Sequence, residues 1–171
     1  MPTRKTSTTK KRQSKKQAEP AQRSRMTTTV YVISPESGRL IAKNKKTYND
    51  LVAQGVIKPG TVKEYQIKKT GNKTWEQLKP KTRSQRLEMY KKHPEMFMLP
   101  PRSDLADKSL NQDNRPKYPI ATYEHPDKVN CQGVKAALAR VHMEHLSRTN
   151  PKRRAYIVQN ITKALNQNCR A

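Results

Sequence analysis

The sequence predicts a small α+β protein, with a β-hairpin-plus-helix module, a C-terminal αα-hairpin and a disordered basic N-terminal arm. Three observations support this fold class. A β-branched run at 28–33 is typical of a strand, apolar residues recur at helical spacing after residue 131, and the first 28 residues lack apolar periodicity. The predicted division is a basic arm at 1–28, a small α+β module at 29–98, a Pro-rich extended linker at 99–128 and the αα-hairpin at 129–171.

The arm contains nine basic residues and one acid, Glu19, separated by Ser, Thr and Gln. High charge with few apolar residues favours disorder, and a basic arm of this kind binds polyanions. We expect its cations to contact nucleic-acid phosphates or, around residues 10–16, to act as a nuclear-import signal; the alternative is a tail that only improves solubility. The basic residues are Arg4, Lys5, Lys10, Lys11, Arg12, Lys15, Lys16, Arg23 and Arg25.

The α+β module is predicted from turn and cap residues between apolar runs. Pro35 and Gly38 suit a turn between two strands, because proline presets φ and glycine adopts positive φ. Thr47 is the expected N-cap of a short helix that stops at Gly55, and Pro94 ends a second helix. The expected elements are strands at 28–33, 39–42 and 62–67 and helices at 47–55 and 82–93.

The segment 99–128 is polar and contains five prolines, which favours an extended linker or a strap laid across a partner. The αα-hairpin after it has the clearest pattern. One helix is expected from about 131 to 148. Asn150 is the expected N-cap of the second helix, and Pro151 is its first helical position. Because two such helices are marginal alone, we expect the hairpin to pack on the N-terminal module or on a partner.

The two cysteines lie at opposite ends of the predicted hairpin, Cys131 at the start of its first helix and Cys169 at the end of its second. An antiparallel hairpin brings them together, so a disulfide is one prediction; two buried thiols, which a reducing cytosol favours, are the alternative. A zinc site with His142 and His145 is disfavoured. His142 lies about 16 Å along the helix from Cys131, whereas zinc holds its ligands at about 2.3 Å.

The charge balance indicates the class of partner. With 37 Lys and Arg against 13 Asp and Glu, the formal charge is +24, which favours binding to a polyanion through release of counterions. No recognition-helix pattern and few aromatic residues are present, so the contacts with nucleic acid are expected to be non-specific. Besides the arm, the expected phosphate contacts are a basic cluster at a helix start, Lys152, Arg153 and Arg154.

Other classes of function find little support in the sequence. No Gly-rich phosphate loop or nucleophile elbow occurs, so we expect neither catalysis nor a cofactor. The apolar runs are too short for a membrane span, and no signal peptide is recognisable at the N-terminus. Oligomeric state and the choice between DNA and RNA leave no trace in the sequence.

One segment, from Ser34 to Leu51, carries a family resemblance. It resembles the N-P-x-T-G-R-x-I…T-Y-x-x-L segment of nucleocytoplasmic large DNA virus proteins, known in one version as the two-cysteine adaptor domain. The positions kept are Pro35, Gly38, Arg39, Ile41, Thr47, Tyr48 and Leu51; the departures are Ser34 for Asn, Ser37 for Thr, Asn44-Lys45 for glycines, and absent flanking cysteines.

The resemblance implies a viral setting. The resulting expectation is a non-enzymatic virion protein that packages or condenses double-stranded DNA, located in the virion and in the host cytoplasm or nucleus during infection. A minor capsid or cement protein, whose segment 99–128 straps neighbouring capsid subunits, is the alternative. A third hypothesis is a host-directed factor that acts in the nucleus. Physically, Ile41, Tyr48 and Leu51 are expected to form a small core, with Arg39 anchoring the turn.

Overall fold

The computed structural model describes residues 28–68, 73–144 and 150–171, and all of the predicted basic arm (1–28) except Thr28 lies outside them. The described part contains both helices and antiparallel strands, which confirms the α+β class. The helices are α1 (Lys46–Ala53), α2 (Trp75–Leu78), α3 (Arg83–Lys92), α4 (Cys131–Met143) and α6 (Pro151–Asn168). The strands are β1 (Thr28–Ile33), β2 (Leu40–Ala42), β3 (Glu64–Lys68), β4 (Phe97–Leu99) and β5 (Lys117–Pro119).

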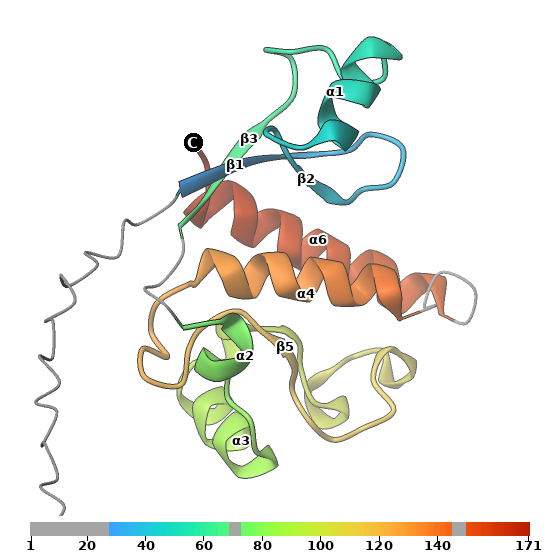
Figure 1. Ribbon diagram of the computed structural model, residues 1–171. Coiled ribbons are helices and arrows are strands. Elements are labelled where there is room, and N and C mark those ends of the chain that lie inside the picture. The colour runs from blue at the N-terminus through green and yellow to red at the C-terminus, as the bar shows by residue number, and fades with distance from the viewer. Residues whose placement is uncertain (1–27, 69–72, 145–149) are drawn as a thin grey trace, which may run out of the picture.

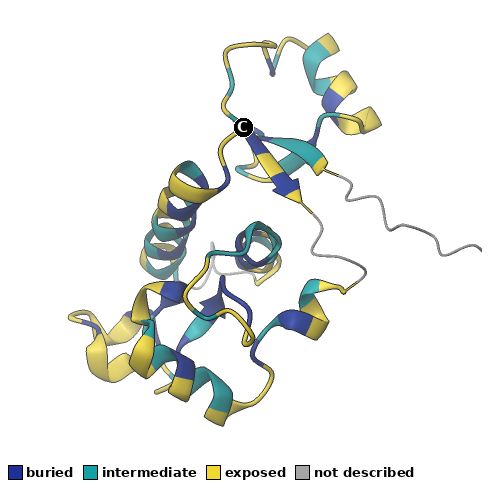
Figure 2. Ribbon diagram, turned by 90° about the vertical axis from the view of Figure 1, so that its left-hand side faces the viewer, coloured by how far each residue is buried: buried dark blue, intermediate teal, exposed yellow. Residues whose placement is uncertain are grey.

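These elements form three layers, and the αα-hairpin is the middle one (Figure 1). The helices α4 and α6 lie in the middle. The three-stranded sheet, in the order β2-β1-β3, lies on one side together with α1, and α2, α3 and the two-stranded sheet β4-β5 lie on the other. The buried faces of the helices turn inward, toward the neighbouring layers, as the colouring by burial shows (Figure 2). The predicted packing of the hairpin on the N-terminal part of the chain is therefore confirmed.

The three-stranded sheet follows the prediction closely. Tyr31 of β1 lies opposite Ala42 of β2 on one side and Tyr65 of β3 on the other, in antiparallel register. The turn is closed by a hydrogen bond of 2.8 Å from the Ser34 amide to the Arg39 carbonyl, and Gly38 has a φ of +66° that favours glycine. The predicted strands at 28–33, 39–42 and 62–67 are thus confirmed within two residues.

The helix α1 covers a small core beside this sheet. Val32, Tyr48 and Ile57 are buried there, with Ile41 and Leu51 packed against them, which confirms the predicted small core. The predicted N-cap was wrong. The Lys45 carbonyl accepts from the Tyr48 amide at 3.0 Å, so helical bonding starts before Thr47, and no side chain caps this end.

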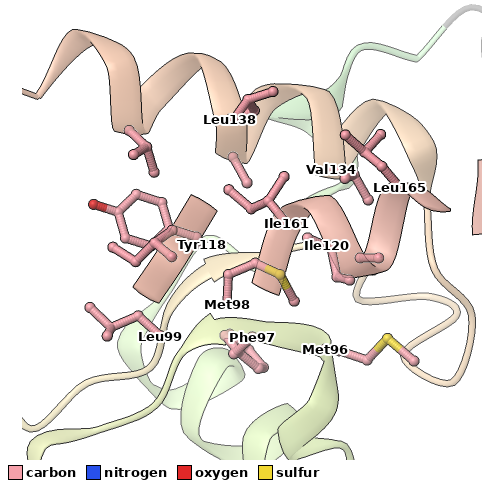
Figure 3. Packing of buried hydrophobic residues seen from close by; sticks show 14 of the residues in the cluster. Met96, Phe97, Met98, Leu99, Tyr118, Ile120, Val134, Leu138, Ile161 and Leu165 are labelled. Atoms are coloured by element: carbon pink, nitrogen blue, oxygen red, sulfur yellow. The ribbon is translucent and has the colours of Figure 1, made fainter. Parts of the chain in front are cut away.

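The main core lies between the αα-hairpin and the second sheet (Figure 3). Val134 and Leu138 of α4 and Ile161 and Leu165 of α6 are each at most 3% exposed. The Asn150 side chain accepts from the Arg153 amide, and Pro151 opens α6, as predicted. The remaining members include Phe97, Leu99, Tyr118 and Ile120.

The predicted extended linker at 99–128 was wrong. The strands β4 and β5 pair with Phe97 opposite Pro119, and Leu105, Leu110 and Ile120 belong to the main core. The fully buried Asn111 side chain donates hydrogen bonds to two backbone carbonyls. These bonds hold the loop in place, as backbone hydrogen bonds between strands hold a sheet. Prolines disfavour long ladders, but Pro119 is tolerated because each strand of a two-stranded sheet is an edge strand.

The predicted boundary at residue 98 was also wrong. The segment 28–68 forms the sheet with α1, whereas 73–99 packs on the opposite side of the αα-hairpin. Tyr65 of β3 lies in the same buried cluster as Phe97 and Val134, so the parts of the chain share one main core. The predicted continuation of the first hairpin helix to 148 falls partly on residues 145–149, outside the described residues.

Candidate functional site

Of the predicted phosphate contacts, the structure describes the basic cluster at the start of α6, since Arg4 to Arg25 lie in the segment 1–27. Lys152 is exposed. Arg153 is partly buried, its Nε has no hydrogen-bond partner among the residues that the structure describes, and its charge acts on the nearby Tyr118 hydroxyl. Arg154 Nη2 donates to His142 Nδ1 at 3.2 Å. Two of the three cations therefore point into the packing of the chain, and Lys152 is the one open to a partner.

His142, which accepts the hydrogen bond from Arg154, connects α4 to the turn of the first hairpin. Because Arg154 donates to Nδ1, Nε2 carries the proton and donates to the Gly38 carbonyl at 3.2 Å. Burial lowers the pKa of His142, and the charge of Arg154 lowers it further. The ring is thus neutral and links α4 to the turn at Gly38. Both of its nitrogens are used in these two hydrogen bonds, so neither is available to bind a metal.

Cations also stand at other helix starts. Lys45 and Lys46 are exposed at the start of α1, and Arg83 is exposed at the start of α3. None of the described helices of eight or more residues has an acidic residue in its first turn. Acidic residues are the ones that stabilise this end of a helix, so cations there are unfavourable by themselves.

A pocket of about 370 Å³ opens between α2, α3, α4 and β5. Ion pairs join Lys79 to Glu76, and both Arg115 (2.7 Å) and Lys117 (3.0 Å) to Asp113. The cations that line the pocket are Lys79, Arg86, Arg115, Lys117 and Arg140, and the acids are Glu76 and Glu144. The lining is therefore strongly cationic.

Arg86 and Arg140 form no ion pair with any carboxylate of the described chain. Arg86 is partly buried and its Nε donates to the Pro80 carbonyl at 3.2 Å. Burial lowers the pKa of Arg86, and the charges of Arg115 and Arg140 lower it further. A half-buried guanidinium next to two others is an arrangement that an anion would stabilise.

The remaining walls of the pocket are aromatic and aliphatic. Trp75 lies so close to α4 that a Cβ at Gly133 would come within 2.5 Å of its ring, so glycine is needed there. The Tyr118 hydroxyl donates to the Glu144 carboxylate, and burial raises the pKa of this tyrosine. Tyr118 also has a φ of +56°, which is unusual for a bulky residue.

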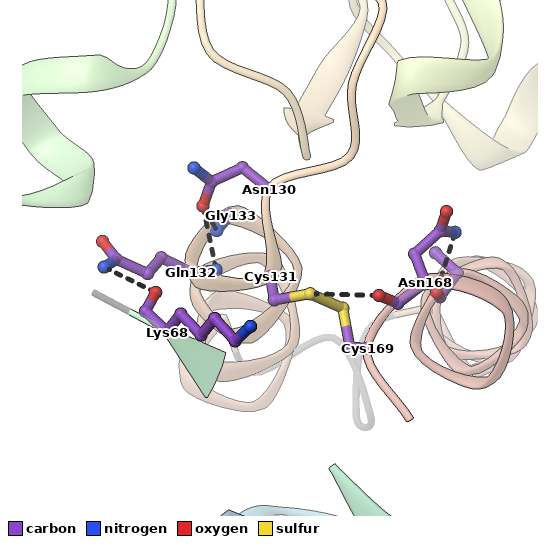
Figure 4. Close-up of a disulfide and its surroundings, with 8 residues drawn as sticks. Lys68, Asn130, Cys131, Gln132, Gly133, Asn168 and Cys169 are labelled. Atoms are coloured by element: carbon purple, nitrogen blue, oxygen red, sulfur yellow. Dashed lines mark hydrogen bonds between the residues drawn. A yellow bond between two sulfur atoms is a disulfide. The ribbon is translucent and has the colours of Figure 1, made fainter. Parts of the chain in front are cut away.

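The structure contains the Cys131–Cys169 disulfide, one of the two alternatives that the sequence leaves open, with a Cα–Cα distance of 5.8 Å (Figure 4). The bond joins the start of α4 to the end of α6. The Cys169 carbonyl accepts from the Gln66 amide of β3 at 2.8 Å, so the C-terminus is tied to the sheet as well. Within the described residues, no group of three His, Cys, Asp or Glu could hold a metal ion.

The pocket cations were missed at the level of sequence, because they come from three segments spread over residues 79–140 and form no motif. None of the helices described here is long and apolar enough to cross a membrane. Comparison of the chain with protein-family models, with curated proteins and with solved structures found no match.

Proposed function

We propose that this protein is a non-enzymatic, virion-associated protein of a large DNA virus that binds double-stranded DNA through non-specific phosphate contacts. The observation that carries this proposal is the placement of cations at helix starts. Lys46 begins α1, Arg83 begins α3 and Lys152 stands in the first turn of α6, all three exposed and without an ion pair to a described carboxylate.

A phosphate group accounts for this placement. The first N–H groups of a helix and its dipole attract anions, so a phosphate there contacts the amides and the lysine or arginine together. Without the anion, each cation at a helix start costs about 0.3–1 kcal/mol. The formal charge of +24 agrees with such contacts, and the arm adds nine further cations for the same phosphate backbone.

The proposal is tested by titrating the full chain onto fluorescent duplex DNA at several salt concentrations. The logarithm of the affinity is expected to fall linearly with the logarithm of salt, with a slope of about 0.9 for each phosphate contacted. The variant Lys46→Gln/Lys152→Gln should lower this slope by about 1.8. A slope near zero for the unmodified chain would refute the proposal.

A matched variant separates specific placement from total charge. Lys91→Gln/Lys92→Gln removes the same charge, but these two lysines stand in the last turn of α3, away from the helix starts, and Lys92 pairs with Glu88. The salt slope of this variant should change by less than about 0.9, the value of one phosphate contact. If both double variants change the slope equally, the helix starts have no special role.

The minor-capsid alternative relied on 99–128 as a free strap. That segment packs in the core of its own chain, so it no longer supports the alternative. Virion association is tested by disrupting purified particles: the DNA-binding proposal expects the protein in the DNA fraction, whereas a cement protein would stay with the shell. Import of a reporter fused to residues 1–28 would favour the nuclear, host-directed hypothesis.

A further inference from the structure

We propose that the pocket between α2, α3, α4 and β5 binds a small phosphorylated ligand carrying two or more phosphate groups. This binding site is separate from the helix starts that carry the proposed DNA contacts, and it stands or falls independently of them. Its ligand contacts are assigned to Arg86, Arg115 and Arg140, with Lys117 at the side of the pocket.

The charge of the pocket is the first argument. Five cations line it against two carboxylates, those of Glu76 and Glu144, and Asp113 beside the lining pairs with Arg115 and Lys117. Glu76 is occupied by Lys79, and Glu144 accepts from the Tyr118 hydroxyl. Arg86 and Arg140 form no ion pair with a carboxylate of the described chain, although Arg86 is partly buried. The pKa of Glu76 is lowered by its hydrogen bond from Lys79 and also by these two charges. Like charges in a partly desolvated site repel each other, so a bound polyanion would stabilise the pocket.

The type of cation is the second argument. Each guanidinium offers a planar fork of N–H donors that matches two oxygens of a phosphate, which an ammonium group cannot do. Three such forks come from three elements or loops: Arg86 from α3, Arg115 from the segment before β5 and Arg140 from α4. Arg115 also donates from Nη2 to Asp113 at 2.7 Å, which leaves its other N–H groups for a ligand. Because three separate parts of the chain supply these groups, they suit a ligand with several phosphate oxygens better than a single carboxylate.

The size and the remaining walls define the ligand further. A volume of about 370 Å³ lies within the usual range of small-molecule sites and is too small for a duplex. Trp75, Met143 and the alanines of α4 give one side of the pocket an apolar surface. An organic group attached to the phosphates, such as a nucleoside, would lie on that side.

Trp75 makes the proposal measurable, because it is the single tryptophan of the chain and it lines the pocket. The full chain is titrated with sodium tripolyphosphate and with ATP while the tryptophan fluorescence is recorded. Both are expected to give a saturable change. ATP binding more tightly than tripolyphosphate would assign the apolar side to the nucleoside, and equal affinities would assign the binding to the phosphates alone.

Arg140→Gln is the decisive variant, because Arg140 is exposed and makes no side-chain hydrogen bond or ion pair to the described residues, so the fold should tolerate it. It should weaken tripolyphosphate binding about 10-fold or more, as expected for losing a charge-assisted hydrogen bond. Arg86→Gln is the second variant and should act in the same direction. Lys91→Gln removes one charge from the exposed last turn of the same helix as Arg86, outside the pocket and away from the helix start, so it is the matched control and should change the affinity less than twofold.

Three results would overturn the proposal. They are an absence of saturable fluorescence change, equal affinities for Arg140→Gln and Lys91→Gln, and citrate binding as tightly as tripolyphosphate. The test also separates the two proposals. A lower salt slope for DNA in Lys46→Gln/Lys152→Gln with unchanged tripolyphosphate binding shows two sites, and Arg140→Gln should change the salt slope for DNA by less than about 0.9, the value of one phosphate contact.

Discussion

Removal of the Cys131–Cys169 disulfide is expected to lower the free energy of unfolding by about 4 kcal/mol. The two cysteines are separated by 38 residues in sequence. For a closed loop of that length, the chain-entropy relation gives about 13 cal/mol/K of lost unfolded-state entropy, or about 4 kcal/mol at 25 °C. The effect arises in the unfolded chain, so it does not depend on a loss of native contacts.

The native contacts around the bond support this reasoning. Cys169 is 2% exposed and its carbonyl accepts from the Gln66 amide. Ala171 donates to the Glu64 carbonyl at 3.1 Å, so the end of the chain stays attached to β3 when the sulfur–sulfur bond is opened. Reduction should therefore leave the folded structure in place and destabilise it only by enlarging the unfolded ensemble.

The measurement is urea unfolding of the oxidised chain, of the chain in dithiothreitol and of Cys131→Ser. With a urea dependence of about 2 kcal/mol/M, the loss corresponds to a midpoint shift of about 2 M. The reduced chain and the Cys131→Ser variant should have the same urea midpoint, and dithiothreitol should not change the midpoint of the variant. A difference below about 1 kcal/mol between oxidised and reduced chain would refute the entropic reasoning.

Two further predictions concern the folded segment 99–128. Asn111→Ala should cost about 2–4 kcal/mol of unfolding free energy, because the buried amide donates to the carbonyls of Pro100 (2.8 Å) and Arg115 (2.9 Å) and both would lose a partner. A cost below about 1 kcal/mol in urea unfolding would mean that this loop is not fixed by Asn111. Arg115, with Lys117, lowers the pKa of Asp113 from 3.8 to about 2. The stability that this carboxylate contributes is therefore present above pH 4 and is lost as the pH falls toward 2. Asp113→Asn should make the urea midpoint less dependent on pH in this window, and an unchanged pH dependence would contradict the assignment.

Elements with local signals were predicted well. The turn at Pro35 and Gly38, the cap formed by Asn150 with Pro151, and the end of α3 before Pro94 depend on residues a few positions apart. The segment 99–128 was not predicted well, because its structure depends on contacts with residues that are distant in the sequence. Its prolines suggest an extended chain, yet β5 pairs with β4, and a single buried side chain, Asn111, satisfies the carbonyls of its loop.

The sequence alone determined the charge of +24, the α+β class and the positions of most helices and strands, because each follows from composition or from neighbours along the chain. Only the tertiary structure decided which cations meet. Arg86, Arg115 and Arg140 come together because α4 packs against α2 and β5, and that packing is set by apolar residues such as Val134, whose contacts span the chain. Convergence of side chains from distant segments leaves no periodicity or motif in a sequence, so the cationic pocket could be found in the folded chain alone.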